Sequence, residues 1–139
     1  MDIQFPSPNL LLFEPLNDKE TLILWKTYKE LYDKVCEFTE INATEINSID
    51  SFAPWIDTWI TQIPERKSTK LRILMIWNSE FISFACQQTI RRYLEQRSFR
   101  CRVWFHVEDP TPIQSAIKSR CIIKRIPTNI HSPMYRDLL

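Results

Sequence analysis

Alternating strand and helix patterns between residues 71 and 126 constrain the fold of this chain more than any other feature. Residues 71–77 form an apolar run without a turn residue, which is typical of a strand buried on both faces of a sheet. Over residues 81–96, apolar side chains recur at spacings of three and four, which predicts an amphipathic helix. Three elements continue the alternation: a strand at 102–107, a short helix ending at Lys118 and a strand at 122–123. This order predicts an α/β fold with a mostly parallel sheet and helices on both faces.

The first 64 residues add a strand and two helices to the pattern. A short apolar run predicts a strand over residues 9–13, and Asp18 is a fair N-cap for a long helix over residues 19–39. Residues 41–50 have the composition of a polar connection. A second amphipathic helix is expected over residues 51–63, ended by Pro64.

Composition and length are those of one globular domain. The chain has 139 residues, of which 44% are hydrophobic, so we expect a single domain with a real core and an extended tail over residues 127–139. No apolar run approaches the roughly 20 residues of a membrane span, and residues 1–4 do not resemble a signal peptide. We therefore expect a soluble, intracellular protein with no membrane partner.

The cysteines and histidines do not have the spacing of a metal or catalytic site. The four cysteines form no C-x-x-C pair, which favours buried free thiols over disulfides or zinc ligands. His106 lies in an apolar strand, and His131 lies in a proline-bounded segment, neither with a second ligand at a suitable spacing. We expect no metal ion.

Charge is distributed unevenly along the chain. Residues 1–66 carry 12 acidic and 5 basic side chains, whereas residues 67–139 carry 13 basic and 5 acidic ones, although the net charge is only +1. Two ordinary solvated surfaces would explain this asymmetry. A basic surface that binds phosphates or an acidic partner would explain it equally well.

The chain contains no glycine at all. Average usage of about 7% would give roughly ten glycines in this length. Glycine lets a backbone approach phosphate oxygens and adopt positive φ angles. The sequence therefore excludes a phosphate-binding loop of the G-x-x-x-x-G-K-[ST] type and a G-x-G-x-x-G nucleotide fold.

Two sequence motifs in the C-terminal half resemble signatures of the small clamp-loader subunits. Residues 87–95, QQTIRRYLE, resemble the A-Q-x-A-L-R-R-x-x-E word of replication factor C and its bacterial counterparts. Residues 116–121, AIKSRC, resemble the A-I-Q-S-R-C word, and the distance between the two words fits the family without a gap. The resemblance implies an AAA+ P-loop ATPase core over residues 9–126, without the lid and collar of that family.

The same comparison places a degenerate nucleotide site in the N-terminal half. Residues 11–21, LLFEPLNDKET, resemble the L-L-F-x-G-P-P-G-T-G-K-T segment of clamp loaders, with one residue fewer before the loop. In this frame Glu14, Asn17 and Lys19 occupy glycine positions, and Thr21 keeps its place. Glu20 replaces the lysine that would contact the β- and γ-phosphates. The resemblance implies that nucleotide is repelled.

Other positions of ATP chemistry are also altered in this frame. The two acidic residues that bind magnesium and activate water fall at Trp77 and Asn78, and the sensor asparagine falls at Glu108. We expect Trp77 and neighbours such as Leu16 to fill part of the former nucleotide cleft.

The resemblance thus implies a non-catalytic pseudo-ATPase without a cofactor. Such a chain would be a structural or regulatory subunit of a clamp-loader-like assembly for DNA replication or repair, in the nucleus, with another AAA+ or DNA-processing protein as its partner. In the family the arginine of the S-R-C word, here Arg120 after Ser119, reaches the neighbouring subunit's γ-phosphate. Alternatively, Arg120 pairs with a carboxylate such as Glu108 or Asp109.

Two other functions remain open. The chain could be a stand-alone protein-interaction module. It could also be a DNA-binding accessory protein that uses its basic half to contact phosphates. The DNA-facing candidates are Arg91, Arg92, Arg97, Arg100, Arg102, Ser119 and Arg120.

Overall fold

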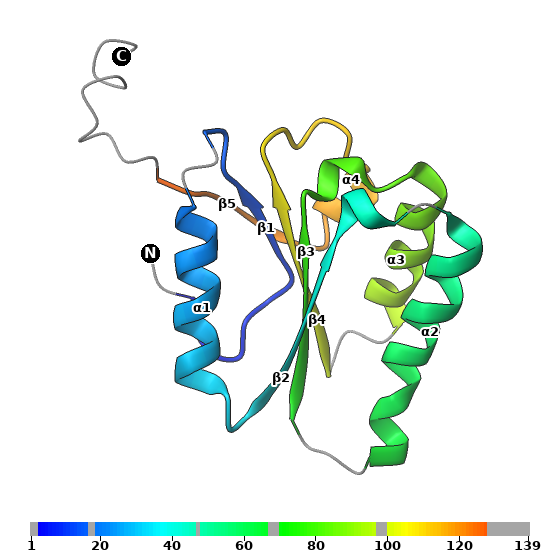
Figure 1. Ribbon diagram of the computed structural model, residues 1–139, viewed down its shortest axis with the longest axis horizontal. Coiled ribbons are helices and arrows are strands. Elements are labelled where there is room, and N and C mark those ends of the chain that lie inside the picture. Colours follow the sequence, from blue (N-terminus) through cyan, green and yellow to red (C-terminus); the bar gives the residue numbers. More distant parts are fainter. Residues whose placement is uncertain (1–2, 17–18, 47, 67–69, 97–99, 128–139) are drawn as a thin grey trace.

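The computed structural model describes residues 3–16, 19–46, 48–66, 70–96 and 100–127. Five strands form one parallel sheet in the order β2-β3-β4-β1-β5 (Figure 1). The strands are β1 (Leu10–Phe13), β2 (Cys36–Asn42), β3 (Leu71–Trp77), β4 (Cys101–Val107) and β5 (Ile122–Arg125). The helices are α1 (Glu20–Tyr32), α2 (Ile49–Arg66), α3 (Phe84–Gln96) and α4 (Ser115–Lys118), with 3₁₀ turns η1 (Ala43–Glu45) and η2 (Ser79–Phe81). The predicted α/β class with a parallel sheet is confirmed.

The helices cover the two faces of the sheet unequally. Among the described residues, α1 is the one helix on one face, and helices α2, α3 and α4 lie on the other (Figure 1). This division follows from the strand order, because right-handed crossovers that run in opposite directions along a sheet place their helices on opposite faces.

Alternation along the strands builds a separate apolar core on each face. In β1, Leu10 and Leu12 pack on the α1 side, whereas Leu11 packs on the side of the other helices. Strand β3 alternates in the same way, with Ile73 on the α1 side and Leu74 on the other. The three inner strands are therefore apolar at nearly every position, as expected for strands covered on both faces.

The long helix predicted over residues 19–39 is wrong in its second half. Helix α1 ends at Tyr32, and β2 begins only four residues later, at Cys36. Strand β2 pairs with β3 along its whole length, from Cys36 beside Leu71 to Asn42 beside Trp77. No glycine or proline separates the helix from the strand, so the sequence contains no stop signal there. Pairing with a neighbouring strand overrides the helical pattern.

Three other boundaries differ from their predictions. The expected polar connection over residues 41–50 holds the end of β2 and the turn η1. Helix α2 continues through Pro64 to Arg66. Helix α3 begins at Phe84 rather than at residue 81, because the Ser83 hydroxyl accepts a hydrogen bond from the backbone N–H of Cys86 (3.2 Å) and caps the helix.

None of the helices in the described part of the chain combines the length and the apolar character needed to cross a bilayer.

Candidate functional site

The carboxyl ends of β1, β3 and β4 meet at the point where the strand connections diverge to opposite faces. The segment after β1 leads to α1 on one face, and the segments after β3 and β4 lead to α3 and α4 on the other (Figure 1). Ligands of open parallel sheets bind at such a switch point. The side chains at this edge of the sheet are therefore the candidates for a functional site.

Glu14 is buried at the switch point and caps helix α1. Its side chain is only 1% exposed. One carboxylate oxygen, Oε2, accepts hydrogen bonds from the backbone N–H of Thr21 (2.7 Å) and from the Thr21 hydroxyl (3.1 Å). A carboxylate at this position is stabilised by the free N–H groups and the dipole of the helix.

His106, near the end of β4, holds the other oxygen of Glu14. Its Nε2 lies 3.1 Å from Glu14 Oε1, and its ring is 3% exposed. The backbone N–H of Asn78 donates to His106 Nδ1 (3.3 Å), so the ring proton is on Nε2 and donates to Glu14. The Glu14 carboxylate thus accepts three hydrogen bonds, from Thr21 on α1 and from His106 on β4.

Two residues beside this network have left-handed backbone conformations. Lys19, directly before α1, has φ 70°, and Asn78, directly after β3, has φ 55°. A left-handed conformation costs most residues roughly 1–2 kcal/mol, and asparagine adopts it more readily than lysine does. Lys19 is one of the positions that the clamp-loader resemblance assigns to glycine, and its backbone has a conformation that favours glycine.

Trp77 closes one side of the site. Its indole N–H donates to Glu40 Oε1 (2.9 Å), and its ring centroid lies 5.2 Å from that of His106. Partial burial alone would raise the pKa of Glu40, but the hydrogen bonds from Trp77 and from Lys29 outweigh it and lower that pKa. The expectation that Leu16 fills the cleft is wrong, because Leu16 is 44% exposed. The buried Glu14 and His106 lie there instead.

The other predicted positions of the degenerate site surround this network without joining it. Glu20 is half-buried in the first turn of α1. Glu108 is exposed, and its backbone N–H donates to the Glu80 carboxylate (2.7 Å). Asn17 lies outside the described residues. The described side chains at this edge are thus mainly acidic, the opposite of what phosphates require.

Arg120 lies at the other end of the sheet. It precedes β5, whose first backbone N–H, on Ile122, donates to the carbonyl of Asn9 before β1 (2.8 Å). The Arg120 guanidinium pairs with Glu95 at the end of α3 (2.8 Å) and donates to the carbonyl of Ala116 (2.8 Å). The alternative that Arg120 pairs with a carboxylate is therefore right in kind, but the prediction of Glu108 or Asp109 as that carboxylate is wrong. Arg120 is placed away from the site of its own chain.

The DNA-facing candidates differ in how accessible they are. Arg92 is exposed on α3, and Arg91 and Arg100 are half-buried. Arg102 has a structural role, because its guanidinium donates to the carbonyl of Ser7 (2.8 Å), in the segment before β1, and to that of Cys101 (3.0 Å). The Ser119 hydroxyl donates to the carbonyl of Ala116, and Arg97 lies outside the described residues.

The described residues offer neither a cluster of metal ligands nor a reactive cysteine. They contain no group of three or more histidine, cysteine, aspartate or glutamate side chains that could hold a metal ion. The cysteines are free, as predicted, and three of them are buried. Burial raises the pKa of Cys36 to about 11 and that of Cys121 to about 12, so neither is a reactive thiolate at neutral pH.

Comparison with known proteins identifies the fold. No family model matches the chain, and no curated protein matches it in sequence. A RuvB variant from Thermotoga maritima matches with a TM-score of 0.64 and 13% identity, over 86% of this chain and 38% of that one. A DNA polymerase III gamma subunit-related protein from the same organism matches with a TM-score of 0.62 and 11% identity, over 94% of this chain and 44% of that one. The fold is that of the AAA+ P-loop ATPases.

In P-loop proteins, phosphates bind at the N-terminus of the helix that follows a strand and its glycine-rich loop. In this glycine-free chain the helix after the first strand is α1, and the carboxylate of Glu14 lies at its N-terminus. The present chain spans less than half the length of the two structures.

Sequence patterns could not reveal the pair formed by Glu14 and His106. The two residues are 92 positions apart, and they meet only because β1 and β4 are neighbours in the sheet. The one signal in the sequence was indirect: a polar residue within the apolar run of β4 requires a buried partner.

Proposed function

We propose that this chain is a non-catalytic AAA+-fold subunit, a pseudo-ATPase that acts in a DNA replication or repair assembly resembling a clamp loader. Its role there is structural or regulatory and needs neither nucleotide nor metal. Activity in the nucleus is part of this proposal.

The observation that carries the proposal is the buried Glu14 carboxylate at the N-terminus of α1. It uses the backbone N–H and the hydroxyl of Thr21, groups that a phosphate would otherwise approach. Two unit charges of like sign about 4 Å apart repel each other by about 4 kcal/mol at an effective dielectric constant of about 20. A triphosphate would therefore have to displace Glu14 and also overcome its charge.

The altered residues around Glu14 support the same proposal. Glu20 supplies an anion where the resemblance expects a lysine, and Trp77 stands where the resemblance expects a magnesium ligand. An indole N–H donates a hydrogen bond and cannot bind a metal ion. Each change removes a different part of the ATP chemistry.

The retained arginine at position 120 supports interaction with a partner subunit. Arg120 keeps the position that the resemblance assigns to an arginine finger, and it lies at the end of the sheet opposite the Glu14 site. A finger in this position can act only on the site of another subunit. The structural neighbours are named as RuvB and as a DNA polymerase III gamma subunit-related protein, which supports an AAA+ or DNA-processing partner.

Affinity purification of the full chain under native salt, followed by identification of the bound proteins, tests this proposal. We expect a stoichiometric complex with a AAA+ or DNA-processing subunit. The discriminating control is binding of the purified chain alone to short DNA duplexes at about 50 and 200 mM salt. Tight DNA binding that falls steeply with salt, without any stable protein complex, would instead favour the DNA-binding accessory function.

A further inference from the structure

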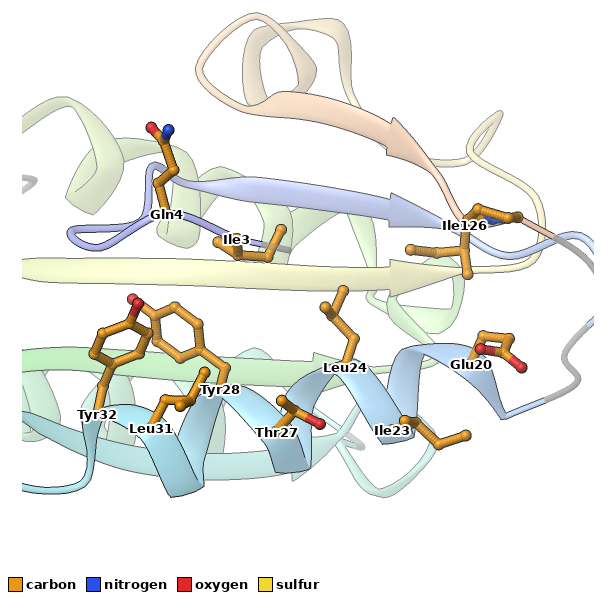
Figure 2. A pocket seen from close by; sticks show the side chains of 11 residues that line it. Ile3, Gln4, Glu20, Ile23, Leu24, Thr27, Tyr28, Leu31, Tyr32 and Ile126 are labelled. Carbon is orange, nitrogen blue, oxygen red and sulfur yellow. The ribbon is translucent and has the colours of Figure 1, made fainter. Parts of the chain in front are cut away.

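An open groove runs beside α1, on the face of the sheet where α1 is the one helix within the described part of the chain (Figure 2). Its volume is about 580 Å³. In Figure 2, Leu24 and Tyr28 of α1 form one wall, and Ile3 and Ile126 lie opposite them. The groove extends along α1 from Glu20 to Tyr32.

Two exposed aliphatic side chains lie along the groove, whose lining also includes the polar residues Gln4 and Glu20. Ile23 and Leu31 lie two turns apart on α1 and are 56% and 68% exposed. Thr27 lies between them and also lines the groove. Large aliphatic side chains in a row at helical spacing are normally buried against another segment.

The width of a single helix explains why this face of the sheet is incompletely covered. Neighbouring strands are about 4.8 Å apart, and a helix with its side chains is about 10 Å wide, so one helix cannot cover five strands. The opposite face has three helices. Parallel sheets are normally covered on both faces, so a further segment is expected beside α1.

The chain itself supplies a segment at this place. Pro127, the last described residue, lines the groove, and Ile126 before it is buried against Ile3 and Trp104. Residues 128–139 follow directly and lie outside the described residues. They include five apolar side chains, namely Ile130, Met134, Tyr135, Leu138 and Leu139.

The length of this segment matches the groove. Helix α1 has 13 residues and is therefore roughly 20 Å long. Twelve residues span about 18 Å as a helix, slightly less than the length of α1, and about 40 Å when extended. The segment can therefore cover most of the groove as a helix and reach its far end when extended. We propose that residues 128–139 pack into the groove beside α1 and complete the cover of this face. This inference is independent of the proposed function.

Limited proteolysis of the full chain tests the inference. Chymotrypsin cleaves after Tyr135, and a synthetic peptide of residues 128–139 gives the rate for an undocked segment. We expect cleavage after Tyr135 in the native protein at least about tenfold slower than in the peptide, because docked segments must open before they are cut. Leu31→Asp should raise the cleavage rate of the native protein most of the way to that of the peptide.

Phe84→Asp is the matched control, because Phe84 is 69% exposed at the start of α3, on the other face of the sheet. It should leave the cleavage rate unchanged. Circular dichroism verifies that both variants fold. Equal cleavage rates for the native chain and the peptide would overturn the inference. A dimer that Leu31→Asp dissociates, with no change in cleavage, would also overturn it, because a second copy would then cover the groove.

Discussion

Glu14→Ala is expected to lower the free energy of unfolding by about 2–4 kcal/mol. The carboxylate is 1% exposed and accepts hydrogen bonds from Thr21 and His106. Alanine removes the cap of α1 and leaves the backbone N–H of Thr21 and the Nε2–H of His106 buried without an acceptor. Urea denaturation, followed by the midpoint and the slope of the transition, measures the change.

Two further variants make this result specific to the network. Glu30→Ala removes an exposed carboxylate from the same helix and should change the unfolding free energy by less than about 0.5 kcal/mol. Glu14→Gln keeps the size of the side chain but presents an amide NH₂ either to Thr21 or to His106, so its effect should lie between those of Glu14→Ala and Glu30→Ala. If Glu14→Ala is as mild as Glu30→Ala, Glu14 does not hold α1 and β4 together.

Arg120→Ala is expected to reduce ATP hydrolysis by a partner ATPase about 10³-fold while the complex stays assembled. An arginine finger stabilises the negative charge that develops on the transferred phosphoryl group. Arg120 is placed for such a role because it lies at the end of the sheet remote from Glu14 and is partly exposed. This prediction rests on the proposed function, so it is measured once the partner complex has been purified.

Glu95→Ala is the matched control for Arg120. It removes the carboxylate that pairs with the guanidinium (2.8 Å) and leaves the arginine in place. If Arg120 is a finger, Glu95→Ala should retain most of the hydrolysis rate. If the pair is only structural, the two variants should behave alike, with an unchanged rate in an intact complex.

The fold could be predicted from the sequence mainly where strands are buried on both faces. The apolar runs of β3 and β4 have no competing helical pattern, and each was predicted to within one residue. Strand β2 was missed, because it lies at an edge of the sheet and its side chains are mostly half-buried, so they alternate weakly. Its apolar residues also continue the spacing of α1, which extended the predicted helix too far.

The candidate site also contains residues that could be named from the sequence and contacts that could not. Glu20 and Trp77 are named as site residues only by the clamp-loader resemblance, and their assignment to a former nucleotide site stays a prediction. The bond between Glu14 and His106 could not be predicted, because it depends on the order of strands in the sheet. The glycine-free sequence excluded a standard phosphate-binding loop. It did not indicate that a carboxylate would lie at the N-terminus of α1.

Titration calorimetry of the full chain with ATP and magnesium measures directly whether this domain binds nucleotide. We expect no heat beyond dilution up to millimolar nucleotide, because Glu14 already occupies the N-terminus of α1 and Glu20 adds a second negative charge. Titration of magnesium chloride alone provides the baseline. A saturable signal with a dissociation constant below about 100 μM, roughly −5.5 kcal/mol, would contradict the claim that this AAA+-fold domain works without nucleotide.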